Sequence, residues 1–293
     1  MSLNLSSLYA QQFATNIALL LQQKGSRLRG HVTEGTYIGK QASPVDQIGA
    51  VIAQKVVSKF AAMGRVDAAV DRRWVLPQDY DLPQLIDSFD RLRMLNDPKS
   101  AYVQNAMYAM GRAMDDEIIT AFFGTNKTGE TASTSTTFPS ANQVAVNFGA
   151  AANTGLTVAK LREAKRLLMT YQVDIDNDPV AAVVKAKQHD NLLAEAQIIS
   201  TDFNQMPVMV EGKVERFLGI TIIYCERLAA DGSGYDRIPV FAKSGMHLGL
   251  WNDIATDVSQ RKDLQSLPWQ VYATGTFGGT RLEENRVTEI KCA

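Results

Sequence analysis

Residues 97–124 read DPKSAYVQNAMYAMGRAMDDEIITAFFG and predict one long helix. Asp97 suits the N-cap, because its carboxylate can accept from free backbone N–H groups, and Pro98 fits the first helical position. Gly124 predicts a left-handed end of the helix. A helix of about 26 residues at ~1.5 Å per residue is roughly 39 Å long, about the width of a small domain. We therefore expect a spine on which other elements pack.

Apolar residues recur along this helix at intervals of three and four. They predict one buried stripe made of Val103, Ala106, Met107, Met110, Met114, Ile118, Ala121 and Phe122. Gln104, Arg112, Asp115 and Asp116 should then lie on the polar face. Charges three and four residues apart on a helix usually form surface ion pairs, so we favour that interpretation over an acid–base site.

The composition is that of an ordinary globular protein. The 293 residues include 30 Lys and Arg against 31 Asp and Glu, a net charge of -1 that argues against a dedicated nucleic-acid binder. A nearly neutral protein also has little net repulsion between its copies. Two distant cysteines, Cys225 and Cys292, suit a reducing compartment. Without a secretory leader or an apolar run of ~20 residues, we expect a soluble protein made in a cytoplasm.

The residues before the spine predict a helix, then strands, then a second helix. Residues 6–24 predict an amphipathic helix that ends at Gly25. Residues 28–82 contain strand formers interrupted by glycines, with a β-prone stretch at 68–76 and an apolar run at 48–63 that fits strand or helix. We interpret 28–82 as an extended β-hairpin arm; a meander within the core is the alternative. Residues 84–95 predict a short helix.

After the spine, residues 125–143 are rich in Ser, Thr and Gly and predict a surface loop. Helices are expected at 157–171 and 190–199, and strands at 181–186, 208–210, 217–225, 238–241, 269–274 and 286–291. Turns are expected at 211–212 and 231–234, and Gly275, Gly278 and Gly279 should bend the chain before the last strand returns. The mixture indicates an α+β domain.

The known motifs of catalysis and metal binding fail in their details. The Gly35 to Lys40 stretch has one spacer too few for a phosphate loop. Asp174, Asp176 and Asp178 imitate a calcium loop, but Pro179 stands in place of the required glycine. The three histidines do not have zinc-site spacing. We therefore predict no cofactor, no metal and no enzymatic activity.

A hydrolase with an unrecognised site stays as a hypothesis, because the members of a catalytic triad meet only in the fold. No G-x-S-x-G elbow is present. Ser244 and His247 would be the residues to test.

Several short strings, taken in order, resemble the major capsid proteins of tailed bacteriophages, which have the Hong Kong 97-like (Johnson) fold. They are Arg72-Arg73-Trp74 through Asp79-Tyr80, Ile86-Asp87 with Asp90, Asp97-Pro98-x-Ser100-x-Tyr102, Gly111-Arg112-x-x-Asp115 with Ile118-Ile119, Gly124 through Gly129, Leu218-Gly219-Ile220, Lys243-Ser244 with Leu248-Gly249, and Gly278-x-x-Arg281 with Val287 and Ile290. The resemblance covers nearly the whole chain.

The resemblance implies a protein that assembles with itself into hexamers and pentamers of an icosahedral shell. It implies an N-terminal arm at 1–27, an extended β-arm at 28–82 that reaches over a neighbour, a peripheral domain at 83–130 and 250–293, and an axial domain at 131–249. Location in the virion, synthesis in the bacterial host cytoplasm and no contact with a membrane are further implications. So are a separate scaffolding protein, a portal protein, a decoration protein and weak, sequence-blind contact with packaged double-stranded DNA. An encapsulin-like nanocompartment is the alternative within the same fold.

We hypothesise that charged side chains of the arm, of the spine and of the C-terminal part of the peripheral domain make contacts between copies. The candidates are Glu34, Lys40, Arg72, Arg73, Arg112, Asp115, Asp116 and Arg281.

Overall fold

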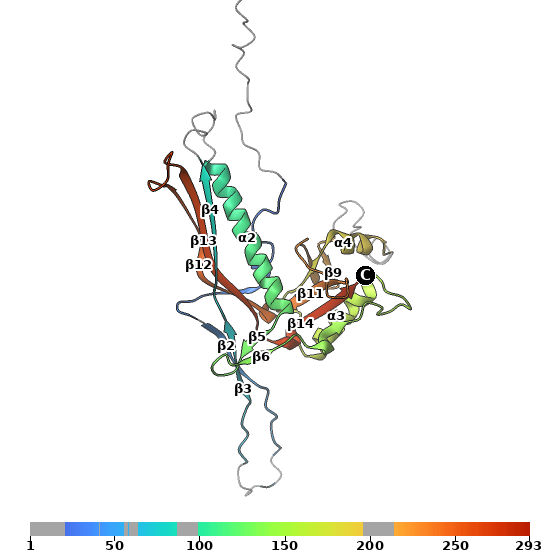
Figure 1. Ribbon diagram of the computed structural model, residues 1–293. Helices are drawn as coiled ribbons and strands as arrows, with labels where there is room; N and C mark the ends of the chain where they lie inside the picture. Colours follow the sequence, from blue (N-terminus) through green and yellow to red (C-terminus); the bar gives the residue numbers. More distant parts are fainter. Residues whose placement is uncertain (1–20, 41, 56–57, 59–63, 87–98, 196–213) are drawn as a thin grey trace, which may run out of the picture.

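The computed structural model describes residues 21–40, 42–55, 58, 64–86, 99–195 and 214–293 (Figure 1). Its helices are α2 (Lys99–Phe123), α3 (Val158–Thr170) and α4 (Ala186–Leu193). Its strands are β1 (Thr33–Thr36), β2 (Ala42–Ile48), β3 (Val70–Val75), β4 (Gln78–Ile86), β5 (Asn126–Thr128), β6 (Thr134–Thr136), β7 (Gln143–Val144), β8 (Val180–Val184), β9 (Arg216–Phe217), β10 (Ile220–Tyr224), β11 (Asp236–Ala242), β12 (Met246–Gln260), β13 (Trp269–Arg281) and β14 (Val287–Cys292). This arrangement confirms the α+β class.

The predicted spine is helix α2, 25 residues long. Its buried side chains include Ala106, Met110, Met114, Ile118 and Phe122, which confirms most of the apolar stripe. Two details of the prediction are wrong. Met107 is 45% exposed, and Gly124 lacks the positive φ of a left-handed end. The predicted caps, Asp97 and Pro98, lie outside the described residues.

Gly124 instead continues the helical hydrogen-bond pattern, because its N–H donates to the Thr120 carbonyl oxygen at 2.8 Å. A Cβ at Gly124 would lie 2.6 Å from that oxygen. The glycine is therefore needed for close approach and not for its left-handed freedom.

The first sheet has the strand order β1-β12-β13-β4, and α2 runs along one of its faces (Figure 1). Ala106 and Met110 pack there against Ala273 of β13. Near the end of β13 a Cβ on Gly279 would lie 2.9 Å from the carbonyl oxygen of Glu117. Gly279 therefore lets the helix approach β13 closely.

The second sheet has the order β7-β14-β11-β8-β10-β9 and is covered on both faces. Strand β8 is buried throughout, as its apolar sequence predicts. Val180, Ala182 and Val184 belong to the core formed with α3 and α4. Ala181 and Val183 belong to a second core that contains the C-terminal half of α2. The spine helix thus packs against both sheets.

The third sheet, β2-β3-β5-β6, lies at the base of a long excursion. Strands β2 and β3 form an antiparallel hairpin, as predicted, and the chain between them extends away from the body (Figure 1). The predicted bounds of 28–82 are too wide, because β1 pairs with β12 and β4 with β13 in the first sheet. In this excursion residues 49–55 and 58 form neither helix nor strand. The Ser/Thr-rich segment after α2 is not a structureless loop, because β5 and β6 pair with each other and β5 with β3.

Other predictions succeed or fail by element. Helix α3 has the expected cap, since Thr157 Oγ1 accepts from Lys160 N at 3.4 Å. Residues 84–86 are strand and not helix, because β4 pairs along β13 as far as Ile86. The last strand, β14, pairs with β11 and β7 of the second sheet and does not return along β13.

Some predictions differ in their bounds or lie outside the described residues. Residues 21–24 are not helical, and the rest of the 6–24 helix lies outside, as do residues 87–95 of the short helix before the spine. Helix α4 begins at Ala186, four residues before the predicted start. The strand predicted at 208–210 and the turn at 211–212 also lie outside. The turn at 231–234 is present, with Gly234 N donating to the Asp231 carbonyl oxygen at 3.0 Å.

Candidate assembly surfaces

Residues 48–70, which we call the arm tip, expose apolar side chains. Ile48 is 74% exposed, Ile52 86% and Val70 73%, and Val51 and Val66 are also exposed. Burial of one such side chain stabilises a protein by roughly 1.5–3 kcal/mol. A row of exposed aliphatic side chains on a projecting segment is typical of a surface that binds another molecule.

The first sheet has a second face, turned away from α2, that carries carboxylates. Directly opposite residues in antiparallel strands point to the same side of a sheet. The register places on this side Asp257 with Tyr272 and Pro83, Ala255 with Thr274 and Asp81, Asn252 with Thr276 and Asp79, and Ser259 with Gln270 and Leu85. Asp79, Asp81 and Asp257 are exposed, and these rows contain no basic residue. We call this surface the acidic face.

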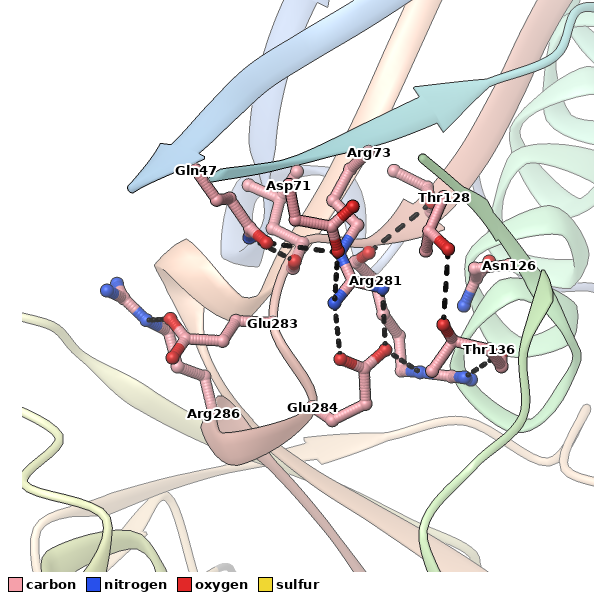
Figure 2. A network of polar contacts seen from close by, with 12 residues as sticks. Gln47, Asp71, Arg73, Asn126, Thr128, Thr136, Arg281, Glu283, Glu284 and Arg286 are labelled. Carbon is pink, nitrogen blue, oxygen red and sulfur yellow. Dashed lines mark hydrogen bonds and ion pairs between the residues drawn. The ribbon is translucent and has the colours of Figure 1, made fainter. Parts of the chain in front are cut away.

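The base of the arm is tied to the body by arginines (Figure 2). Arg73 is buried and donates to both carboxylate oxygens of Glu284, at 3.0 and 2.6 Å, and to Gln47 Oε1 at 3.2 Å. Arg72 is more exposed and binds both oxygens of Asp46, at 2.5 and 3.0 Å. Of the two candidates, Arg73 is therefore the one that is buried by contacts within its own chain.

Arg281 is fully buried next to this cluster (Figure 2). Its guanidinium donates to the carbonyl oxygens of Ala121 at 3.0 Å, Gly124 at 2.7 Å and Thr136 at 3.2 Å, and also to that of Phe122. These oxygens include the free acceptors at the end of α2, where a cation also complements the helix dipole. Burial lowers the pKa of Arg281 to about 10. The residue therefore caps the spine helix from inside the molecule.

Asp115 is fully buried, and the prediction of a surface ion pair is wrong for this part of α2. Its carboxylate accepts from Arg27 N at 3.0 Å and from Leu28 N at 3.1 Å. Arg112 donates to Gln22 Oε1 at 2.7 Å, and Asp116 binds Arg227. Arg112, Asp115 and Asp116 thus each bind a segment distant in sequence and do not pair with one another.

Glu34 lies in β1, an edge strand of the first sheet, and Lys40 lies four residues after that strand. Glu34 accepts from Arg29 Nε at 3.1 Å, while Arg29 also binds both oxygens of Asp253. The hydrogen bond to Arg29 lowers the pKa of Asp253, and the one to Asp253 raises the pKa of Arg29. Lys40 is exposed.

The geometry around Ser244 and His247 argues against a hydrolase that uses them together. Ser244 Oγ donates to Asp178 and accepts from Arg286. His247 Nδ1 lies 2.9 Å from Thr33 Oγ1, and its Nε2 lies 2.8 Å from the Tyr37 hydroxyl. Both ring nitrogens are therefore occupied by other residues. Burial lowers the pKa of His247 to about 4, which keeps the ring neutral.

A hollow of about 550 Å³ lies between the base of the arm and the segment before β14. Its lining includes Ser244 and Arg286 of the body, together with Ile48 and Val70, the two residues at which the arm tip joins the arm base. Within the described part of the chain, no group of His, Cys, Asp and Glu residues is placed to hold a metal ion. The helices of these same residues include none with the length and apolar character to cross a membrane.

Sequence reasoning missed three residues with clear structural roles. Lys160 is fully buried and donates through Nζ to the carbonyl oxygens of Thr154, Gly155 and Lys291 at 2.7 to 3.0 Å. Gly111 lies against the backbone of residues 25 and 26. Tyr80 stacks on Phe277 at a centroid distance of 4.8 Å. Only Gly111 had a local signal, since glycine inside a helix is unfavourable without a packing reason.

Comparison with known proteins identifies the fold and the family. The chain is similar to the capsid protein of cyanophage Pam1, with 13% identity, a TM-score of 0.74 and coverage of 100% of this chain and 98% of that one. It is also similar to the capsid protein of cyanophage P-SCSP1u, with 16% identity, a TM-score of 0.72 and coverage of 100% and 95%. It is also similar to the capsid protein of a native GTA particle, with 14% identity, a TM-score of 0.70 and coverage of 98% of this chain and 96% of that one. Curated proteins give no match.

These likenesses confirm the expected Hong Kong 97-like (Johnson) fold. A family model described as phage capsid protein matches residues 5–293. The match favours the phage interpretation over the nanocompartment and the hydrolase. The chain therefore belongs to the phage capsid protein family and is a structural protein of the shell of a bacteriophage virion.

Proposed function

We propose that copies of this chain form hexamers and pentamers of a closed shell, and that the arm tip of one copy lies on the acidic face of the next. The observation that supports this most directly is the exposed apolar row of the arm tip. In a closed symmetric shell, each copy can bury this surface on the same site of a neighbouring copy.

Charge supports the same pairing. The arm tip contains Lys55, Lys59 and Arg65 against one acidic residue, Asp67, which pairs with Arg65 at 2.6 Å. The acidic face contains three carboxylates, together with the apolar surface of Leu85, Pro83 and Tyr272. Complementary charge favours one orientation of the contact and speeds encounter.

We also propose the domain roles that the family implies. Helix α2 with the first sheet would be the peripheral domain, and the second sheet with α3 and α4 the axial domain, in which β14 takes part although it is near the C-terminus. Scaffolding, portal and decoration proteins are proposed partners. Contact with packaged DNA would be weak and sequence-blind, given the balanced charge. Synthesis in the host cytoplasm and the lack of enzymatic activity belong to the same proposal.

The arm tip is tested by a substitution at Ile52, the most exposed large apolar side chain among its described residues. Ile52→Asp should reduce the yield of shells in electron microscopy at least severalfold, because a carboxylate would enter an apolar contact. The unassembled chain should keep its stability to within about 0.5 kcal/mol, as expected for a surface position. Ile52→Val is the matched control. Normal shell yield from Ile52→Asp would contradict the proposal.

The acidic face is tested separately. Replacing Asp79, Asp81 and Asp257 by Asn should also reduce shell yield and weaken its dependence on salt, because screening acts on exposed charges. Arg72→Glu should impair assembly without unfolding the chain. Arg73→Glu is a poor test of the interface, since Arg73 is buried against Glu284.

A further inference from the structure

Residues 22–28, which we call the clasp, lie across the middle of α2 and reach the second sheet. On the helix side, Arg112 donates to the Gln23 carbonyl oxygen at 3.1 Å and Asp115 binds the clasp backbone. On the sheet side, Arg27 donates to the Tyr224 carbonyl oxygen at 2.6 Å, at the end of β10. The clasp therefore contacts both structural units of the molecule.

The clasp backbone packs against α2 at Gly111, where the helix has no side chain; we call this position the notch. Gly111 is buried, and a Cβ at this position would lie 2.5 Å from Ser26 N and 2.7 Å from Gly25 Cα. Gly25 has a φ of 72°, in the left-handed region that favours glycine. Gly111 thus allows a contact between two backbones that a Cβ at this position would block, and Gly25 supplies the left-handed backbone conformation of the clasp.

A buried carboxylate then holds the clasp in the notch. Asp115 is 0% exposed and accepts from the N–H groups of Arg27 and Leu28, from Ser26 Oγ at 2.5 Å and from Gln23 Nε2. Leu28 follows directly and is itself 1% exposed in the core next to α2. The donors all come from the clasp, so the carboxylate is fully satisfied only while the clasp is seated.

We propose that the clasp is a positioning site for assembly. Seating residues 22–28 on Gly111 and Asp115 determines the point on the body at which the preceding N-terminal residues begin and holds α2 against the end of β10. The role in assembly depends on the proposed shell function, but the seating itself does not. A chain with an open clasp would fold, but residues 22–28 would have no defined position on the body.

Limited trypsin digestion of the unassembled chain tests the seating, because Lys24 and Arg27 are cleavage sites within the clasp. Gly111→Ala should speed cleavage at these two sites about tenfold, since a blocked notch leaves the segment open. Alanine is the better helix former, so α2 itself should not be weakened. Mass spectrometry of the fragments separates these cuts from those in the arm. Gln104→Ala, at an exposed position of α2, is the control.

Asp115→Asn is the second variant, with Asp116→Asn as its neighbour on the same helix. It should also speed cleavage at Lys24 and Arg27, and both clasp variants should lower shell yield in electron microscopy. Unchanged cleavage in both variants would overturn the seating. Faster cleavage with a normal yield of regular shells would overturn the positioning role, and the Ile52→Asp result would still stand as the separate test of the shell.

Discussion

Arg281, Lys160 and Asp115 are fully buried charged side chains, and their partners are mainly backbone groups. Arg281 and Lys160 each donate to three or more carbonyl oxygens, and Asp115 accepts from two backbone N–H groups. A buried charge is tolerated when such bonds replace its hydration. These residues therefore hold chain segments at positions where regular secondary structure ends.

Arg281→Met should lower the free energy of unfolding by roughly 3 kcal/mol, because the carbonyl oxygens at the end of α2 lose a charged donor while they remain buried. Denaturant unfolding of the unassembled chain measures the change. Arg286→Met is the control, because the Arg286 pair with Glu283 is about 40% exposed. That control should lose less than about 1 kcal/mol. Equal losses in the two variants would contradict the capping role.

His247 should make stability depend on pH. Its folded pKa of about 4 lies below the value of 6.5 in the unfolded chain, because the ring is buried. Between these values the unfolded state binds more protons, so stability falls as the pH drops from 6.5 to 4. The loss should total roughly 3 kcal/mol.

The measurement compares unfolding of the wild type and His247→Gln between pH 4 and 7.5. The variant should be less stable at pH 7.5, since the Thr33 and Tyr37 contacts are impaired. The difference in stability should narrow toward pH 4, because only the wild type loses stability through protonation of His247 in its unfolded state. A constant difference across this range would rule out the assigned protonation.

At the scale of the element, helices and strands differ in how much of their stability is local. Helix α3 has its own cap, an amphipathic pattern and buried residues on one side, which local sequence specifies. Strand β5 is polar and exists through its pairing with β3 and β6. Asn126 in β5 is also held by its hydrogen bond to the Ala121 carbonyl oxygen at 3.0 Å.

Thr157→Ala should lower the free energy of unfolding by about 1 kcal/mol, the usual effect of removing an N-cap. The lost contact is the one from Lys160 N to Thr157 Oγ1. Thr157→Ser keeps this acceptor and should stay close to the wild type. Thermal unfolding followed by circular dichroism suffices for the comparison, and a serine variant as weak as the alanine one would exclude the cap as the cause.

At the scale of the whole molecule, the spine helix, the arm base and the second sheet meet near Glu284 (Figure 2). Arg73 comes from the arm base, Arg281 from the end of β13, and Glu284 from the segment that leads into β14. One carboxylate therefore joins the arm to the crossing between the two sheets. The contact adds to the β3–β5 pairing that joins the arm base to the body.

A double-mutant cycle with Arg73→Met and Glu284→Gln should give a coupling energy of about 2 kcal/mol, because the pair is bidentate and largely buried. The same cycle on the exposed pair Arg72 and Asp46 should give no coupling beyond experimental error. Chemical unfolding of the four chains in each cycle provides the numbers. Additive losses at Arg73 and Glu284 would show that the contact does not join the two units.

The sequence by itself determined the spine helix, the capped helix α3, the buried strand β8, the hairpin of the arm and the resemblance to phage capsid proteins. These features follow from local periodicity, capping residues and the order of short strings. The tertiary structure alone decided that Asp115 is buried under the clasp, that Arg281 caps α2 from 157 or more residues away, and that β14 joins the second sheet. The physical reason is that a buried polar group or a strand edge is satisfied by whichever partner folding brings to it, and no local pattern encodes that partner.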